Sequence, residues 1–347
     1  MNRLRHQQQP LSSSGPYRPR GLRRIVHPLG PLFRHLPLAL RRHLLFLRHR
    51  GSWGNFRTPR GFGEKMQWRV LNDRRPLLAW TADKLAQKEY VRNLASSNAA
   101  VQPVRIPITY WAGNNSAELR ALSPQLPEGW VFKPNHSCGR FRIFGAMPSG
   151  TARPDWEELI ALTSEWGDYD EEKRIMGHWA YTHSRIAMIA EERIGGVERP
   201  LEIKVLCFGG RAHSLMSQEG IGTDDWRVAY YDTQFNRVNS GWSHELPIHA
   251  HDLKNALPPS VRTTLIQAAE TLAAPFDFMR VDFYVAENEV WFGELTPYSG
   301  GGLVPVSNEL DLERGAQWQL PDLAAHDPRA AEWRALLEGP LRGTLQR

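Results

Sequence analysis

The residues with the clearest chemical potential lie in a predicted β-hairpin near the end of the chain. Its arms, Val281–Val285 and Val290–Phe292, are rich in β-branched and aromatic residues, and Glu287–Glu289 is a plausible three-residue loop between them. Such a loop places Asp282 directly opposite Glu294 on one face. Because two neighbouring carboxylates repel each other, this pair would favour a divalent cation, and oxygen ligands on rigid strands suit Mg2+.

The same hairpin allows other interpretations. A surface hairpin would point both acids into water, and a two-residue loop would shift the register by one and move the acids to opposite faces. Arg280 precedes Asp282 by two residues and therefore shares its face. Its guanidinium could stabilise charge that develops on phosphoryl oxygens, or it could simply pair with Asp282 or Glu294.

A second group of candidates follows an apolar strand that ends in Lys133. The loop His136–Arg140, which includes Ser137 and Gly139, comes next. Backbone N–H groups of such a loop can surround phosphate oxygens, and a nearby lysine adds positive charge. The loop has one glycine and does not match the phosphate-binding loop of Walker-type nucleotide hydrolases. An ordinary hairpin turn is the alternative.

Two further acidic positions have a strand-like context. Glu191 and Glu192 end an apolar strand, where one of them could accept hydrogen bonds from a ribose while neighbouring backbone groups contact an adenine edge. The alternative is a pair of acids at the solvated end of a strand. Glu202 and Lys204 alternate with apolar residues, so they share one strand face and could pair with each other or reach phosphate.

The elements that must position these residues mix helices and hairpins without regular strand–helix alternation, which favours an α+β fold over a doubly wound sheet. Segment 219–259 is expected to be mostly loop, and the tail from about 320 is expected to be helical. Helices are predicted over 64–72, 79–94, 155–166, 259–274 and near 170–179, and strands over 104–111, 129–144 with a polar loop, 185–194 and 201–218 with a turn at Gly209–Gly210.

Composition bounds the partners. Residues 1–50 hold 11 arginines and neither lysine nor acid. The rest of the chain therefore has 32 of the 43 basic residues and all 37 acidic ones, a net charge of −5. The basicity is therefore an N-terminal arm, and no nucleic-acid partner is expected, because the body is acidic and the arm has no binding motif. The two cysteines give no disulfide framework, which fits a reducing cytoplasmic compartment.

The second half of the arm reads as a basic amphipathic helix over 38–50. It could lie on an anionic membrane surface, giving a peripheral location at the inner membrane face, or it could dock on the protein with a solvated arginine face. No apolar run approaches the roughly 20 residues that span a bilayer.

Taken in order, several motifs resemble the ATP-grasp superfamily, and more closely its TupA-like branch, named for teichuronopeptide biosynthesis. The resemblance covers residues 60–320 approximately. The matching stretches are Glu64–Trp68, Asp83–Lys84, Tyr90–Arg92, Leu126–Pro127, Phe132–His136, Trp179–Tyr181, Ile189–Glu192, Ile203–Gly209, Phe278–Phe283, Gly293–Thr296 and the glycine-rich turn Gly300–Gly302.

The resemblance implies ATP and Mg2+ as cofactors and assigns roles by motif. Thr296 stands where many ATP-grasp ligases carry asparagine, which makes it a weaker metal ligand, although the TupA-like branch often has threonine there. The roles implied are Lys84 and Lys133 on the nucleotide phosphates, His136–Arg140 as the loop over them, Glu191 and Glu192 at the adenine and ribose end, Lys204 facing the triphosphate, Asp282, Glu294 and Thr296 on Mg2+, and Arg280 on the transferring phosphoryl group.

The function implied is an ADP-forming carboxylate–amine ligase that works through an acyl phosphate, in cell-surface polysaccharide or peptide-conjugate synthesis. Its partners would be a small-molecule, glycan or peptide carboxylate and an amine acceptor. A kinase acting on a hydroxyl and a non-catalytic nucleotide-binding partner of a glycosyltransferase are the alternatives. The expected units are a basic arm at 1–50, a helical region at 51–125, a small subdomain at 126–195, a large subdomain at 196–320 and a tail at 321–347.

Overall fold

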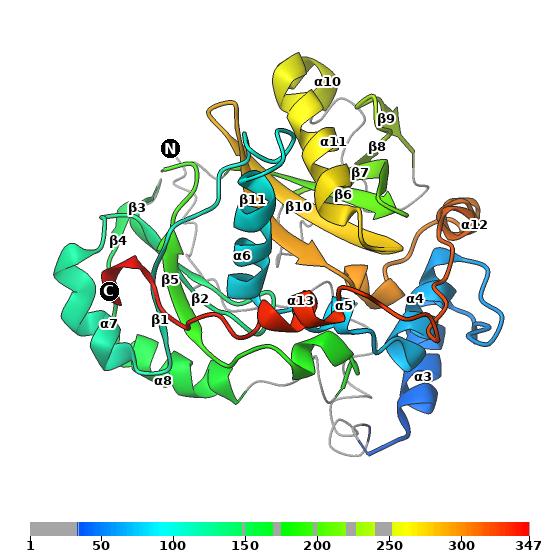
Figure 1. Cartoon of the computed structure of the whole chain (residues 1–347), viewed down its shortest axis with the longest axis horizontal. Coiled ribbons are helices and arrows are strands. Elements are labelled where there is room, and N and C mark those ends of the chain that lie inside the picture. Colours follow the sequence, from blue (N-terminus) through cyan, green and yellow to red (C-terminus); the bar gives the residue numbers. More distant parts are fainter. Residues whose placement is uncertain are drawn as a thin grey trace, which may run out of the picture.

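Two antiparallel β-sheets lie side by side and dominate the structure, a computed structural model (Figure 1). It describes residues 33, 35–147, 150–168, 175–196, 200–219, 227–239 and 252–346. Most of the basic arm, part of the helix predicted near 170–179 and much of segment 219–259 therefore lie outside the described residues. Helices and strands mix as expected, so the predicted α+β class is confirmed.

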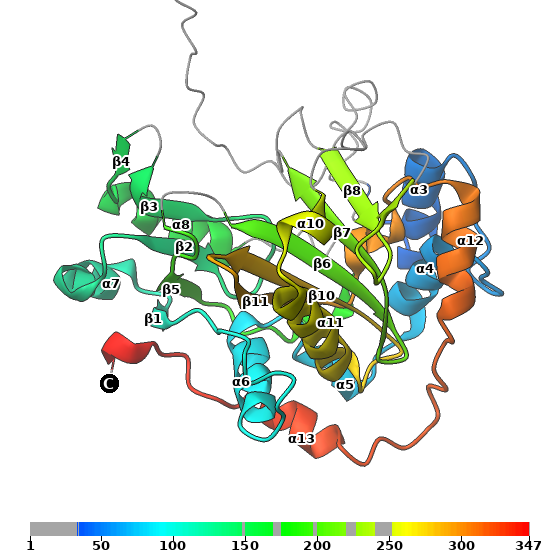
Figure 2. The same ribbon diagram turned by 90° about the horizontal axis from the view of Figure 1, so that it is seen from above.

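The smaller sheet has five strands in the order β1-β5-β2-β3-β4. Helices α7 and α8 cover one face, and tryptophans, phenylalanines and leucines of that face form a core with them (Figure 2). Trp130 and Phe132 point into this core, so the residues between and after them in β2 face the other way. The strands are β1 (Thr109–Gly113), β2 (Trp130–Pro134), β3 (Arg142–Met147), β4 (Gly150–Ala152) and β5 (Met188–Glu192).

The larger sheet has six strands in the order β11-β10-β6-β7-β8-β9. Helix α11 packs on one face through apolar residues spaced three and four apart. Two strands, β8 and β9, lie in segment 219–259, so the prediction of mostly loop was wrong for the described part of that segment. The strands are β6 (Leu201–Phe208), β7 (Arg211–Glu219), β8 (Arg227–Tyr231), β9 (Arg237–Val238), β10 (Phe278–Ala286) and β11 (Glu289–Thr296).

The acidic hairpin β10–β11 has the predicted pairing of its two acids but not the predicted loop. Its loop has two residues, Glu287 and Asn288, both with positive φ as a type I′ turn requires, so the predicted three-residue loop was wrong. A β-bulge at Gly293 adds one residue to β11 and shifts the register back. Asp282 therefore lies opposite Glu294 after all.

Most predicted helices are present with shifted ends. The helix predicted over 79–94 begins only at Lys84, where Asp83 caps it by accepting a hydrogen bond from the N–H of Ala86, and Ala79 ends the preceding short helix. The tail beyond 320 contains only short helices, so its predicted helical character was largely wrong. The helices are α3 (Leu38–Arg50), α4 (Phe62–Asn72), α5 (Pro76–Ala79), α6 (Lys84–Ala95), α7 (Ser116–Leu122), α8 (Trp156–Gly167), α10 (Leu253–Ala256), α11 (Pro259–Ala273), α12 (Asn308–Gln317) and α13 (Ala330–Ala335), with short 3-10 turns η1 (Ser123–Gln125), η2 (Trp179–Thr182), η3 (Ser299–Gly302) and η4 (Thr344–Gln346).

Helix α3 docks on the protein through its arginines rather than presenting them to water. Arg42 is completely buried, and Arg50 pairs with Asp311 at 2.9 Å. Leu40 and Leu47, in contrast, are 39% and 42% exposed. Membrane contact through the rest of the arm stays a prediction. No helix within the described residues has the length and apolar character needed to cross a bilayer.

The glycine-rich turn after β11 is held by buried side chains from the N-terminal helices. Arg42 donates to the carbonyl oxygen of Gly301 at 2.6 Å and to Gln67 Oε1 at 2.7 Å. Gln67 donates to the same carbonyl oxygen at 2.9 Å. The sequence predicts a flexible turn here, whereas the structure anchors it through two buried donors.

The C-terminal segment crosses from the larger sheet to the smaller one (Figure 2). Trp333 in α13 is buried in the core under the larger sheet, and the side-chain amide of Gln346 pairs with both backbone groups of Ala112 in β1. This contact covers part of an otherwise open sheet edge. Strand β1 belongs to the smaller sheet although it precedes residue 126, where the predicted small subdomain begins.

Candidate functional site

The candidate residues lie on the sheet faces that α7, α8 and α11 leave uncovered. On the larger sheet, Asp282 in β10 pairs in register with Lys204 in β6, on the face away from α11. On the smaller sheet, Lys133 and Glu191 lie on the face away from α7 and α8. Lys84 of α6 interacts with both groups: burial lowers its pKa, Glu294 of the larger sheet opposes this, and Lys133 of the smaller sheet adds to it.

On the larger sheet, two cations surround the buried carboxylate of Asp282. Lys204 Nζ lies 2.7 Å from Asp282 Oδ2 and 2.7 Å from Glu202 Oε1. Arg280 donates from Nε to Asp282 Oδ1 and from Nη2 to Asp282 Oδ2, both at 2.7 Å. Each of the pairings expected in the absence of ligand, Glu202 with Lys204 and Arg280 with the acids, is confirmed.

Arg280 also extends the cluster to the second arm of the hairpin. Its Nη2 lies 3.4 Å from Glu294 Oε1 and 3.1 Å from Thr296 Oγ1, and its Nη1 lies 3.3 Å from Ser299 Oγ at the start of the glycine-rich turn. Thr296 Oγ1 donates to Glu294 Oε1 at 3.1 Å. One guanidinium thus connects all three predicted metal ligands.

The charges in this cluster stabilise one another against the cost of burial. Burial alone would raise the pKa of Asp282, but Arg280 and Lys204 outweigh it and hold that pKa below its usual range. Burial likewise acts to lower the pKa of Lys204, and the carboxylates of Asp282 and Glu202 outweigh it, so the pKa is raised. Asp282 therefore remains anionic and Lys204 cationic at neutral pH.

The donor set fits Mg2+. Asp282 and Glu294 face each other with hard oxygen donors, and Thr296 adds a hydroxyl oxygen. Mg2+ is usually held by one or two carboxylates together with water and substrate phosphates. Within the described residues no group of three or more histidine, cysteine, aspartate or glutamate side chains could hold a metal.

On the smaller sheet, the carboxylate of Glu191 lies between two lysines. Lys133 Nζ contacts its Oε1, and Lys88 Nζ donates to its Oε2 at 2.8 Å. Burial alone would raise the pKa of Glu191, but Lys133 and Lys88 lower it to about 2. Both carboxylate oxygens are therefore engaged by lysines, and the predicted ribose contact of Glu191 stays a prediction.

The other predicted residue at the ribose end takes a structural position. Glu192 Oε2 accepts a hydrogen bond from the N–H of Ile108 at 3.0 Å, and the N–H of Glu192 donates to the Ile108 carbonyl oxygen at 2.8 Å. Glu192 thus ties β5 to the segment that precedes β1. Its contact with a nucleotide stays a prediction.

The predicted phosphate loop begins buried and ends exposed. His136 is 1% exposed and its Nε2 lies 2.9 Å from the Trp166 carbonyl oxygen, so its ring anchors the loop to the end of α8. Ser137 is 2% exposed, and its hydroxyl has no hydrogen-bond partner among the described residues. An unsatisfied hydroxyl beside a cationic site is a feature that a phosphate oxygen would satisfy.

Lys84, the first residue of α6, connects the loop 136–140 to this helix. Its Nζ donates to the carbonyl oxygens of Ser137 at 2.5 Å and Asn135 at 3.4 Å. Gly139 has a φ of +69°, which favours glycine, and Arg140 lies 3.4 Å from Glu165. Lys84, Lys133 and the loop are brought together as the resemblance implies, and their phosphate contacts stay predictions.

Sequence reasoning missed three residues of these clusters. Lys88 lies on Glu191, Gln218 donates to Glu202 Oε2 at 2.8 Å, and Ser299 accepts from Arg280. Gln218 carried little signal, because both its neighbours in β7, Ser217 and Glu219, are polar as well. Lys88 carried no signal, since a lysine in a helix is ordinarily a surface residue.

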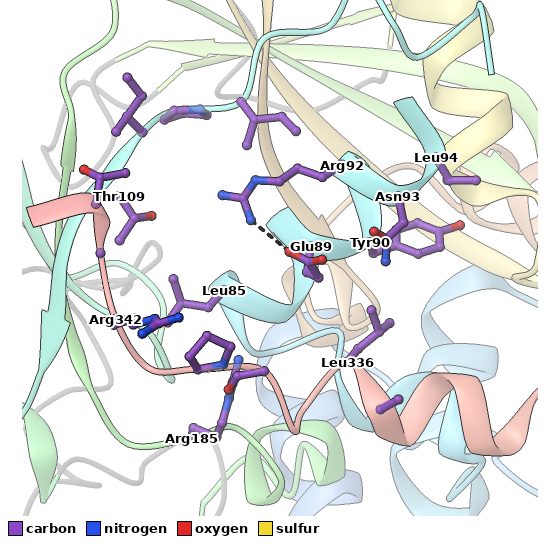
Figure 3. A pocket seen from close by; sticks show the side chains of 18 of the residues that line it. Leu85, Glu89, Tyr90, Arg92, Asn93, Leu94, Thr109, Arg185, Leu336 and Arg342 are labelled. Carbon is purple, nitrogen blue, oxygen red and sulfur yellow. Dashed lines mark hydrogen bonds and ion pairs between the residues drawn. The ribbon is translucent and has the colours of Figure 1, made fainter. Parts of the chain in front are cut away.

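A cavity of about 1180 Å³ in the described part of the chain is a separate feature (Figure 3). It lies between α6, the segment before β1 and the C-terminal segment, with Leu85, Glu89, Arg92, Leu336 and Arg342 among its lining residues. None of the predicted site residues line it. In α6, Lys84 and Lys88 therefore contribute to the charged clusters, whereas Leu85, Glu89 and Arg92 line this cavity.

Comparisons with solved structures give only distant similarities. The chain is similar to D-alanine–D-alanine ligase from Bacillus anthracis (14% identity, 75% of this chain, 66% of that chain, TM-score 0.38). It is similar to VanG D-Ala:D-Ser ligase from Enterococcus faecalis (14%, 75%, 62%, TM-score 0.39) and to D-cycloserine synthetase DcsG (14%, 70%, 71%, TM-score 0.37). The chain spans about two thirds or less of the length of the two D-alanine-adding ligases.

These structural likenesses are too distant to assign an activity, and no functionally curated protein matches the chain at a significant level. The family model of the TupA-like ATP-grasp proteins, in contrast, matches residues 64–319, which is well over half of the chain. The match contains every candidate site residue from Lys84 to Thr296. The chain therefore belongs to the TupA-like ATP-grasp family and has the ATP-grasp fold.

Proposed function

We propose that the protein is an ATP- and Mg2+-dependent ligase that joins a carboxylate to an amine and releases ADP. One observation carries the proposal: the Arg280 guanidinium contacts Asp282, Glu294 and Thr296 together, with Lys204 on the same carboxylate. A compact group of oxygen donors interleaved with fixed cations suits a phosphoryl group in transfer, where charge spreads over several oxygens.

In the proposed reaction, a substrate carboxylate oxygen attacks the γ-phosphorus of ATP. The bond from that phosphorus to the β–γ bridging oxygen breaks, and ADP leaves with the bonding electrons. An amine nitrogen then attacks the acyl carbon, the bond from carbon to the phosphate oxygen breaks, inorganic phosphate leaves, and the amine loses a proton to solvent. The protein's part is to position the reactants and to neutralise charge.

The residues divide these tasks by sheet. Lys84 and Lys133 would bind the nucleotide phosphates from the side of the smaller sheet, and Arg280 and Lys204 would stabilise the transferring group from the larger sheet. When bound, Mg2+ would neutralise charge on the phosphate oxygens, and Asp282, Glu294 and Thr296 are the residues that would hold it.

The substrate class is proposed from family membership alone. An amino acid, a peptide or a sugar acid would supply the carboxylate or the amine in the synthesis of a cell-surface polysaccharide or peptide conjugate. The glycine-rich turn is a candidate acceptor contact, because Ser299 at its start lies 3.3 Å from Arg280 Nη1.

Product accounting tests the reaction type. With MgATP, candidate carboxylates and hydroxylamine as a general amine, a ligase releases ADP and inorganic phosphate in equal amounts and forms a hydroxamate. A kinase releases ADP with a stable phosphorylated product and no inorganic phosphate, and this outcome would replace the ligase assignment.

A matched pair of variants shows whether the measured turnover comes from this protein or from a contaminating enzyme. Asp282→Asn removes a proposed metal ligand at almost constant volume, and Glu309→Gln makes a similar change at an exposed acid in α12. We expect the first to lose at least about 10³-fold in turnover and the second to retain it. If the wild-type protein binds MgATP but none of the carboxylates leads to ADP release, a non-catalytic role is favoured.

A further inference from the structure

Lys88 is an unexpected member of the charged cluster on the smaller sheet. It is 4% exposed, and its Nζ makes three short contacts, to Glu191 Oε2 at 2.8 Å, Thr109 Oγ1 at 2.8 Å and the Pro107 carbonyl oxygen at 2.9 Å. All three donor hydrogens of an ammonium group are thereby used. Burial lowers the pKa of Lys88 to about 8, and Glu191 opposes this, so the ammonium group is still predominantly charged at neutral pH.

The pairing of Lys88 changes the charge that a ligand meets. Glu191 contacts Lys133 through one oxygen and Lys88 through the other. With Lys133 alone, Glu191 would form a neutral pair, and the cation meant for phosphate would be cancelled. With both lysines the three groups carry a net charge of +1, so one positive charge remains.

Exposure shows which lysine is available to a ligand. The Lys133 side chain is 21% exposed, whereas those of Lys88 and Glu191 are 5% and 7% exposed. An incoming anion can therefore reach Lys133, and the two inner groups stay covered by α6 and the segment before β1.

We propose that Lys88 is a positioning residue of the nucleotide site, whose ammonium neutralises Glu191 so that Lys133 keeps its positive charge for a polyphosphate. Glu191 then serves to aim Lys133, rather than to bind ribose. This inference rests on the proposed function in placing a polyphosphate beside Lys133, and it adds the residue that sets the charge there.

The test separates charge from structure through three variants. Lys88→Met lowers the net charge of the group to zero, Glu191→Gln raises it to +2, and the double variant restores +1. Lys254→Met, an exposed lysine in α10, is the matched control. Calorimetry measures the Kd of each protein for MgATP, for inorganic tripolyphosphate and for adenosine, which carries no charge.

We expect Lys88→Met to weaken tripolyphosphate and MgATP binding by roughly 10- to 100-fold, the order for one unit charge about 8 Å away at an effective dielectric constant near 20. Adenosine binding should change less than about twofold, Glu191→Gln should bind tripolyphosphate at least as well as wild type, and the double variant should return close to wild type. A role in shape alone cannot give this rescue, because the double variant loses both partners.

Several results would overturn the inference: wild-type affinity in Lys88→Met, an equal loss for adenosine, or a double variant no better than Lys88→Met. If Lys88→Met fails to fold in a thermal melt, Glu191→Gln decides, since a loss of tripolyphosphate affinity there contradicts the proposal. Tripolyphosphate binding without MgATP binding in wild type would defeat the proposed function and leave this inference standing. Binding of neither would defeat both.

Discussion

The two charged clusters face the same region with opposite balances. On the smaller sheet, Lys84, Lys88 and Lys133 surround the single acid Glu191, a net charge of +2. On the larger sheet, the three acids Glu202, Asp282 and Glu294 enclose the two bases Lys204 and Arg280, a net charge of −1. Phosphate oxygens suit the first arrangement and a divalent cation suits the second, so under the proposed function the two halves of a metal–nucleotide complex would bind to different sheets.

The largest expected effect comes from breaking the acidic cluster at its centre. Asp282→Asn should destabilise the protein by about 3 kcal/mol, because Lys204 and Arg280 then lie buried beside a neutral amide. Urea unfolding measures this, with Glu309→Gln as the control. A loss below about 1 kcal/mol would mean that Glu202 and Glu294 alone satisfy both cations.

The basic cluster should respond to acid through Glu191. Its pKa of about 2 lies below the ordinary value of 4.5, so its contribution is present above pH 4.5 and is lost as pH falls towards 2. Two and a half units correspond to about 3 kcal/mol at most. Glu191→Gln should remove this part of the stability decrease while the part due to Asp282 remains, as unfolding curves at several pH values would test. Parallel curves for both proteins would contradict it.

The bulge tests whether the acidic cluster depends on hairpin register. A Cβ at Gly293 would lie 2.8 Å from the Asp282 carbonyl oxygen, so Gly293→Ala must displace the backbone that sets Asp282 opposite Glu294. We expect a loss of roughly 1–3 kcal/mol and a weaker Mg2+ dependence of ATP binding. Gly167→Ala at the end of α8, whose Cβ meets nothing closer than 4.0 Å, is the control. An unchanged Mg2+ dependence would show that the register is robust.

The smallest effect on stability is expected at the exposed end of the acidic cluster. Glu294 is 33% exposed and contacts Arg280 only at 3.4 Å, so Glu294→Gln should change the free energy of unfolding by less than about 1 kcal/mol. Its effect on the Mg2+ concentration needed for ATP binding should be much larger, at least about tenfold. A titration of Mg2+ at fixed ATP measures this, and a stability loss equal to that of Asp282→Asn would erase the distinction.

Local alternation explains what the sequence could predict. Asp282, Arg280, Glu202 and Lys204 were placed on their faces correctly, because side chains in a strand alternate with a period of two. The hairpin loop was wrong because positive φ at Glu287 and Asn288 leaves only a weak signal in the sequence. The pairing survived through the compensating bulge.

Tertiary packing explains what the sequence could not predict. Lys88 is buried only because α6 packs between the segment before β1 and the larger sheet, and Arg42 is buried only because α3 meets the glycine-rich turn. Neither residue differs from a surface cation in its sequence neighbours. Likewise, the sequence does not reveal that two lysines engage Glu191, because Lys133 and Lys88 come from separate elements.

The burial of Arg42 gives the second part of the basic arm a structural role. Residues 38–50 act as a structural support, since Arg42 reaches Gly301, two residues from Ser299, which in turn contacts Arg280. Removing residues 1–50 would therefore remove both the predicted membrane contact and the support that Arg42 gives to the glycine-rich turn, and the two effects could not be told apart. Truncation before Leu38 keeps α3 and its contact with the turn. A comparison of vesicle binding and MgATP binding between the two truncated proteins therefore tests the membrane contact and the structural support separately.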